Sequence, residues 1–191
     1  MKLIKDKKIL VAADWAGFPL KEVIVKYLES KGWEVTDIGV KDPDDPNVEM
    51  FHRIGLRAGS MITEKEFERA IIFCGTGMGV HLAAAKCPGV RCGVVESVPA
   101  ARRCVIGNDV NVLSLGAWYV APEMGKAAVD AFLSTKFGDD HEWWPDFYEY
   151  HKIAVDEMDA FDYDEYKANG FQVNKLGDLT LSLVDKPEQC C

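Results

Sequence analysis

The sequence contains no long apolar run. No stretch approaches the ~20 consecutive apolar residues that a membrane-spanning helix needs. The N-terminal segment 1–9 carries basic residues but lacks the apolar core of about 7–15 residues that a secretory signal peptide requires. We therefore expect a cytoplasmic protein.

The spacings typical of metal sites and disulfide frameworks are also missing. The chain has six cysteines without a Cys-x-x-Cys pair, and its four histidines never stand at positions i and i+4. Six cysteines in 191 residues do not form the framework of a small disulfide-rich domain. We expect no structural zinc site.

An excess of basic residues is absent as well. The formal net charge is −9, yet residues 1–141 carry 19 acidic and 18 basic side chains and are nearly neutral. Residues 142–191 carry 12 acidic and 4 basic side chains, with nine of the twenty aromatic residues. Nucleic acids and anionic membranes require a basic surface, so neither is an expected partner. The asymmetry divides the chain into a body, 1–141, and an acidic, aromatic-rich C-terminal extension, 142–191.

Apolar runs and helical periodicities alternate along the body. Short apolar runs predict five strands, at 8–13, 33–38, 70–74, 90–95 and 111–115. Amphipathic spacing predicts helices at 20–31, 48–62, 81–86, 99–105 and 122–133, and one more in the extension at 154–166. This order predicts an α/β fold, a Rossmann-like three-layer α/β/α arrangement around a five-stranded parallel sheet. Sites in such folds lie beyond the carboxyl ends of the strands, which selects Asp14, the turn 74–79 and the turn 96–97.

The glycine-rich turn Cys74-Gly-Thr-Gly-Met-Gly79 joins a predicted strand to a predicted helix. Glycines at every second position allow a tight turn that presents backbone N–H groups, a pattern that favours anion binding. The spacing matches neither the G-x-G-x-x-G pattern of dinucleotide-binding folds nor a P-loop. We expect an anion-binding turn that is neither a dinucleotide site nor a P-loop.

Cys74 opens this turn, and its residue type allows three roles. It is a nucleophile if His81, the nearest histidine along the chain, reaches the thiol. It is a general base if it removes a carbon-bound proton while backbone N–H groups hold the resulting enediolate. It is a small buried hydrophobe if neither chemistry applies. The turn alone leaves these roles open.

Several spaced motifs occur in one order and resemble those of the type B ribose-5-phosphate isomerase family, which includes the galactose-6-phosphate isomerase subunits. The motifs are Ala13-Asp14-Trp15-Ala16-Gly17-Phe18-x-Leu20-Lys21, Gly32-Trp33-Glu34-Val35-x-Asp37-x-Gly39, Ile72-x-Cys74-Gly-Thr-Gly-Met-Gly79, Ala83-Ala-Ala-Lys86-x-Pro88-Gly-Val-Arg91 and Asn108-Asp109-x-Asn111-Val-Leu-x-Leu-Gly116. The resemblance covers about residues 7–137 and makes the body a Rossmann-like sugar isomerase domain.

The resemblance implies an aldose–ketose isomerase that works through a cis-enediol without a metal or an organic cofactor. It implies that Cys74 is the base, because Val80 stands where some members carry a glutamate base. It assigns Thr76 to hydroxyl-proton transfer and Asp14 to opening of the sugar ring, although Asp14 also suits a helix cap. The N–H groups implied to hold the enediolate belong to Gly75, Gly77 and Gly79.

Two positions depart from the family's ring-opening and substrate-binding histidines. Trp15 replaces the histidine of the first turn, and Gly107 replaces the histidine that precedes Asn108 and that the family supplies from the partner subunit. By the same resemblance, Trp15 and Asn108 are expected to touch substrate. His81 is a candidate replacement for one lost histidine, or a helix-start residue with a local role.

The family's phosphate-binding arginines after the last helix are also missing, and acidic residues such as Asp139 and Asp140 stand there. The candidate replacement cations are Arg53, Arg102, Arg103 and Lys136. Trp15, Trp143 and Trp144 would instead suit an unphosphorylated sugar. The substrate is therefore expected to be a sugar or a sugar phosphate, with both open.

The family's active sites lie between subunits, so the resemblance implies a homodimer or a tetramer with the extension packed on a partner subunit. An alternative from another class is a catalytically inactive sugar-binding or pseudo-subunit of an isomerase complex. A flavodoxin-like binding domain is disfavoured because the sequence has no nucleotide or flavin motif.

Overall fold

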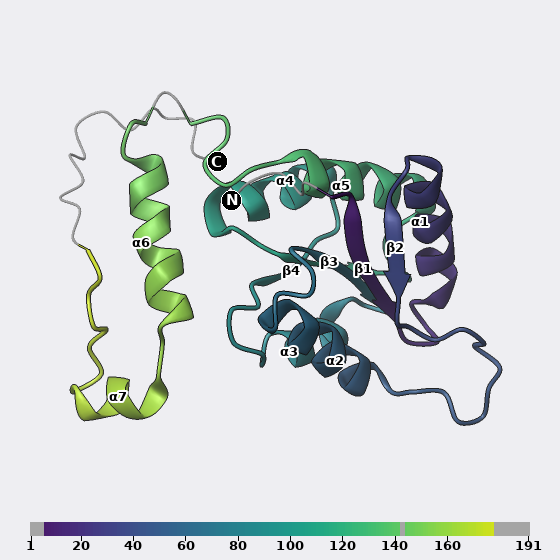
Figure 1. Ribbon diagram of the computed structural model, residues 1–191, viewed down its shortest axis with the longest axis horizontal. Helices are drawn as coiled ribbons and strands as arrows, with labels where there is room; N and C mark the ends of the chain where they lie inside the picture. The colour runs from purple at the N-terminus through teal and green to yellow at the C-terminus, as the bar shows by residue number, and fades with distance from the viewer. Residues whose placement is uncertain (1–5, 142–143, 178–191) are drawn as a thin grey trace. The chain divides into compact units, whose positions relative to one another are not determined.

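The structure, a computed structural model, describes residues 6–141 and 144–177. The chain divides into two compact units, Met1–Glu142 and Trp143–Cys191, and Figure 1 shows the helices and strands of each. No helix in the described ranges is both long enough and apolar enough to cross a bilayer. Trp143, a candidate sugar-binding residue, lies outside the described residues.

The first unit is built on a five-stranded parallel sheet. The strands are β1 (Lys8–Ala13), β2 (Glu34–Asp37), β3 (Ala70–Cys74), β4 (Cys92–Val94) and β5 (Val112–Gly116). They pair in the order β2-β1-β3-β5-β4, and every pair is parallel. The carboxyl ends of β1, β3 and β5 therefore meet at one edge, where Cys74 pairs in register with Gly116.

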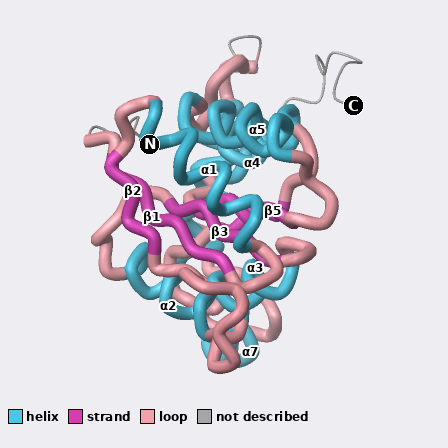
Figure 2. The backbone as a smooth tube through the Cα atoms, turned by 90° about the vertical axis from the view of Figure 1, so that its right-hand side faces the viewer, coloured by secondary structure: helices cyan, strands magenta, loops and turns pink. Residues whose placement is uncertain are grey.

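Helices cover both faces of the sheet, which confirms the predicted three-layer α/β fold. They are α1 (Phe18–Ser30), α2 (Phe51–Thr63), α3 (Met78–Ala84), α4 (Val98–Asn108) and α5 (Pro122–Ser134). Figure 2 shows α1, α4 and α5 on one face and α2 and α3 on the other.

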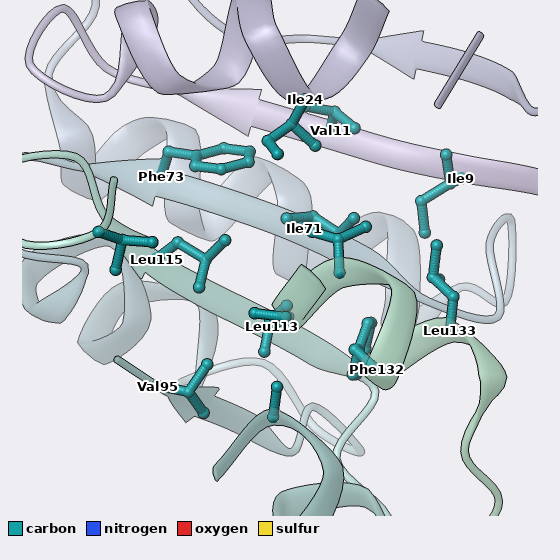
Figure 3. Packing of buried hydrophobic residues seen from close by; sticks show 14 of the residues in the cluster. Ile9, Val11, Ile24, Ile71, Phe73, Val95, Leu113, Leu115, Phe132 and Leu133 are labelled. Carbon is teal, nitrogen blue, oxygen red and sulfur yellow. The ribbon is translucent and has the colours of Figure 1, made fainter. Parts of the chain in front are cut away.

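The strand alternation divides the core between the two faces. Ile71 and Phe73 of β3 pack with α1, α4 and α5 in one buried cluster, part of which Figure 3 shows. Ile72 and Cys74 of the same strand belong to the opposite cluster with α2 and α3. Because successive side chains of a strand point to opposite faces, the last residue of β3 directs its thiol toward the α2–α3 layer.

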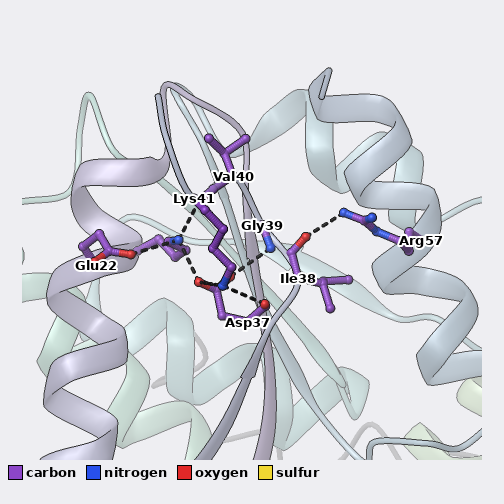
Figure 4. Close-up of polar contacts among 8 residues, drawn as sticks. Glu22, Asp37, Ile38, Gly39, Val40, Lys41 and Arg57 are labelled. Atoms are coloured by element: carbon purple, nitrogen blue, oxygen red, sulfur yellow. Dashed lines mark hydrogen bonds and ion pairs between the residues drawn. The ribbon is translucent and has the colours of Figure 1, made fainter. Parts of the chain in front are cut away.

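A buried ammonium group fixes the loop that follows β2 (Figure 4). The Lys21 side chain is 0% exposed, and its Nζ lies 2.8 Å from both Asp37 Oδ2 and the Val40 carbonyl oxygen. The Val40 N–H donates to the Ala13 carbonyl over 2.8 Å. Burial raises the pKa of Asp37, but hydrogen bonds from Lys21 and Lys41 outweigh it and lower that pKa overall. The cluster holds the loop beside the end of β1, next to Asp14.

The second unit contains α6 (Phe147–Asp159) and α7 (Tyr163–Ala168). The single helix expected at 154–166 is therefore wrong. The chain leaves the helix at Ala160, and the Asp162 side chain accepts a hydrogen bond from the Glu165 N–H over 2.9 Å, which caps the start of α7. Apolar periodicity continues across this break, so the pattern predicts one helix where the structure has two.

Candidate active site

The turn between β3 and α3 has the tight geometry that its glycines predict. Gly77 adopts the left-handed conformation, with φ +75°, and caps α3. Its carbonyl oxygen accepts a hydrogen bond of 2.6 Å from the buried Ser114 hydroxyl of β5. The expected helix start at His81 is wrong, because α3 begins directly after Gly77, at Met78. Gly79 thus lies in the first turn of the helix.

Cys74 lies at the end of β3 with its sulfur against this turn. The Gly77 N–H donates to Cys74 Sγ over 3.0 Å, and Thr76 Oγ1 lies 3.9 Å from the same sulfur. Cys74 is 5% exposed, whereas the two residues before it are 0% exposed. In the described part of the chain, no imidazole lies within hydrogen-bonding distance of this sulfur, so the geometry does not supply the His81 activator of the nucleophile hypothesis. The Gly77 N–H, expected to face substrate, is directed at the sulfur instead.

Each of the three glycines is required by a different neighbour. A methyl group on Gly77 would lie 3.0 Å from the backbone of β5, at Gly116 N and the Leu115 carbonyl carbon. A methyl group on Gly75 would lie 2.7 Å from the indole ring of Trp118, and one on Gly79 would lie 2.7 Å from the ring of Phe51. The turn is therefore backed by the sheet and flanked by two aromatic rings.

Trp118 and Phe51 were not identified from the sequence. Trp118 follows β5, so its position at a carboxyl strand end was the signal that could have selected it. The Ala117 N–H donates to the Cys74 carbonyl and the Trp118 N–H donates to the Gly75 carbonyl, both over 2.9 Å. These bonds fix the residues after β5 against the turn.

Asp14 is buried at the end of β1. Its Oδ1 accepts a hydrogen bond from the Gly17 N–H over 2.8 Å, which orders the entry into α1. Burial raises the pKa of Asp14, and the opposing hydrogen bonds from the Gly17 and Ala16 backbone only partly offset this rise. Trp15, the next residue, is exposed at the same edge. The N-cap residue of α1 is Gly17, without a side-chain cap, so Asp14 holds the turn before the helix.

Asn108 lies at the opposite edge of the sheet from Cys74. It is the last residue of α4, and the following Asp109 pairs with Arg91 over 2.8 Å. Arg91 immediately precedes β4, so this cluster marks the amino ends of the strands. One chain by itself therefore does not bring Asn108 to the glycine-rich turn. His81 lies half-buried on α3, at the same edge as Cys74.

Three of the four candidate cations lie away from the turn. Arg102 pairs with Asp140, and Arg103 Nη1 lies 3.0 Å from Nε2 of the buried His141. Lys136 follows α5, whose end is held at the amino edge of the sheet by a 2.9 Å hydrogen bond from buried Arg69 to the Thr135 carbonyl. The remaining candidate, Arg53, is exposed on the first turn of α2.

Comparisons with known proteins give a consistent result. A family model described as Ribose/Galactose Isomerase matches residues 9–143. The 4-deoxy-4-sulfo-D-erythrose isomerase of Clostridium sp. strain MSTE9 is 39% identical over 160 residues, which are 84% of this chain and 98% of that protein. The D-erythrulose-4-phosphate isomerase of Pectobacterium atrosepticum is 33% identical over 129 residues, 68% of this chain and 84% of that protein. The solved structure of Clostridium thermocellum ribose-5-phosphate isomerase B aligns with a TM-score of 0.71 at 29% identity, covering 84% of this chain and 99% of that one.

Proposed function

The chain belongs to the ribose/galactose isomerase family and is an aldose–ketose isomerase, and we propose that its substrate is a four-carbon aldose with an anionic group on C4, preferably a sulfonate. The alignment with the sulfo-erythrose isomerase carries this proposal. Its 160 aligned residues exceed the 142 residues of the first unit, so the similarity extends into the second unit. The family model ends at residue 143, the first residue of that unit.

The chemistry of a four-carbon substrate fits the missing histidines. A tetrose substituted on C4 has no free C4 hydroxyl, so it cannot close a furanose ring and stays an open-chain aldehyde. Such a substrate needs no ring-opening step. Trp15 and Gly107 stand where the family resemblance places ring-opening and substrate-binding histidines, and an open-chain substrate makes the ring-opening role unnecessary.

We assign the proton transfers as follows. Cys74 Sγ, as the thiolate, takes the proton from C2, and the electrons of that bond form the C1–C2 double bond of the enediolate. Thr76 passes the O2 proton to O1, and Sγ then returns its proton to C1 while O2 becomes the ketone. The substrate and product are isomers, so no oxidant or reductant is consumed. The Gly77 N–H holds the sulfur in place, which leaves Gly75 and Gly79 as glycine donors for the enediolate oxygen.

A direct assay tests the substrate. Purified protein is incubated in D₂O with 4-deoxy-4-sulfo-D-erythrose, D-erythrose 4-phosphate or ribose 5-phosphate, and NMR follows ketose formation and deuterium at C1. We expect the highest kcat/KM with the sulfonate. A phosphate-bearing tetrose is the second candidate, because the similarity to the erythrulose-phosphate isomerase favours it. Turnover of ribose 5-phosphate alone would refute the four-carbon assignment, and binding without deuterium exchange would identify an inactive subunit.

We also propose that the active enzyme is a cytoplasmic homodimer with its active sites between subunits. The position of Asn108 at the edge opposite Cys74 supports this arrangement, because only a second copy can bring an Asn108 to the turn. The second unit, with its exposed aromatic residues Tyr148, Phe161 and Tyr163, is assigned to packing on the partner subunit.

A further inference from the structure

Two exposed aromatic rings close the sides of the glycine-rich turn. Trp118 packs against Gly75, and Phe51 packs against Gly79, each within 2.7 Å of where a glycine Cβ would stand. Trp118 is nevertheless 63% exposed and Phe51 39% exposed. One side of each ring therefore contacts the turn, while much of its remaining surface faces the surroundings.

The backbone of Trp118 has little freedom to move away. Besides the two hydrogen bonds from residues 117 and 118 to the turn, Gly116 lies so close that a Cβ there would be 2.6 Å from the Thr76 backbone. Tyr119 and Val120 then donate back to the Gly116 carbonyl over 3.0 and 2.9 Å. The indole is thus carried by a turn whose backbone is fixed by hydrogen bonds to the carbonyls of Cys74 and Gly75.

From this geometry, and resting on the proposed isomerase function, we infer that Trp118 is a specificity-determining residue that limits how far the substrate chain extends beyond C2. The reacting carbons must contact Cys74 Sγ, and Gly75 is the next residue along the chain. The indole packs against Gly75, so it lies beside the residue that follows the proposed base, Cys74. A carbon chain leaving the turn on that side meets an apolar wall, and Phe51 closes the other side.

The wall is suited to a short chain with a weakly hydrated anion. An indole offers apolar contact with C–H groups and one N–H donor, but no positive charge. A pocket wall of this kind discriminates by methylene count, since one methylene misfitted in an apolar pocket changes the rate by about 10–200-fold. Removing the ring should therefore relax chain-length selection without changing the proton-transfer groups.

The test compares two aldehydes that differ only in length. One is 4-deoxy-4-sulfo-D-erythrose, and the other carries one additional methylene between C3 and the sulfonate-bearing carbon; neither can close a ring. The variants are Trp118→Ala, Trp118→Phe and, as a matched control, Tyr119→Ala, which removes the adjacent ring that is 58% exposed. The readout is the ratio of kcat/KM for the long substrate to that for the short one.

We expect Trp118→Ala to raise this ratio about tenfold or more, while Trp118→Phe and Tyr119→Ala leave it within about twofold of the wild-type value. Should Trp118→Ala be too slow to assay, calorimetric binding of the two matching alditols, which cannot isomerise, gives the same ratio without turnover. An unchanged ratio in a folded Trp118→Ala protein, by either readout, overturns the inference. Failure of the proposed function is separate, because it appears as absent activity on the short aldehyde in the wild-type protein.

Discussion

The backbone N–H of Gly77 donates a hydrogen bond to the sulfur of Cys74 over 3.0 Å. The donor residue is in the left-handed region, with φ +75°, so this conformation sets the position of the sulfur. A hydrogen bond from a fixed backbone donor holds the sulfur beside the turn. The glycine therefore belongs to the chemistry of the site as well as to its shape.

Replacement of Cys74 tests the proposed base. We expect Cys74→Ala to reduce kcat by about 10²–10⁴-fold, the usual contribution of a general base, and to leave the melting temperature nearly unchanged. Deuterium exchange at C1 and C2 should fall by the same factor, because proton abstraction itself is lost. Wild-type exchange in the alanine variant would remove Cys74 from the mechanism.

Replacement of Gly77 tests the link between turn conformation and chemistry, and Gly89 provides a matched control. Both glycines are left-handed, at φ +75° and +71°, but a Cβ on Gly89 would meet nothing within 4 Å. Each alanine substitution should cost roughly 1–2 kcal/mol of unfolding free energy from backbone strain. Only Gly77→Ala should also lower kcat. Equal kinetic losses in both variants would show that general destabilisation explains them.

Much of this architecture follows from local pattern. The apolar run Ala70–Cys74 is a strand with the expected bounds, and the glycine-rich turn follows it as predicted. The helix start at Met78 was missed because the left-handed conformation of Gly77 decides it, and a spacing rule does not contain that information. The contact of Trp118 with Gly75 joins two loops that are distant in sequence, so it exists only once β3 and β5 are paired.

Asp14→Asn separates a structural role, as acceptor for the Gly17 N–H, from a catalytic one. Asparagine keeps an oxygen for the Gly17 N–H, so activity on the sulfonated tetrose should stay within about threefold of wild type, against the 10²–10⁴-fold loss typical of a missing acid or base. Burial raises the pKa of Asp14, so the folded state disfavours the ionised carboxylate. The stability that the protonated carboxyl contributes is therefore lost as pH rises through the folded pKa. Thermal unfolding should show the variant gaining stability relative to wild type at pH 7 and losing that advantage below the ordinary carboxyl pKa. A hundredfold loss of activity would instead assign Asp14 to proton transfer.

Asp37→Asn tests the buried charge cluster. The substitution leaves the fully buried Lys21 ammonium with only the more exposed Glu22 carboxylate, 3.0 Å away, and we expect a loss of up to about 3 kcal/mol at neutral pH. The pKa of Asp37 is lowered, so its stabilisation is present above the ordinary carboxyl pKa and is lost as pH falls through the lower folded value. The difference between wild type and variant, measured by urea unfolding, should therefore be constant above about pH 5 and shrink below pH 4.

The exposed pair of Lys8 and Glu34, 3.5 Å apart, is the control for that experiment. Lys8→Gln should cost less than about 1 kcal/mol, because exposed ion pairs contribute little. A comparable loss in the two variants would mean that burial of Lys21 adds nothing to the strength of its pairing.

Mixed subunits test the proposed location of the active site between chains. Cys74→Ala and Asn108→Ala proteins, each expected to be impaired alone, are unfolded together and refolded at equal concentration. In random hybrid dimers one of the two sites receives both native residues, so activity should recover to about a quarter of the wild-type level. No recovery, with hybrids present by native mass spectrometry, would place Asn108 outside the partner's site.

The unequal surroundings of the three turn glycines have a consequence for how this enzyme can diversify. Gly77 is held by main chain, so a mutation there disturbs the proton-transfer groups together with the sheet. The side chains of Phe51 and Trp118 flank the turn, and Trp15 is exposed at the same edge of the sheet. New substrate preferences can therefore arise by exchange of these three residues while the reaction itself is inherited unchanged. A directed-evolution library aimed at another sugar acid or sugar phosphate should begin with them.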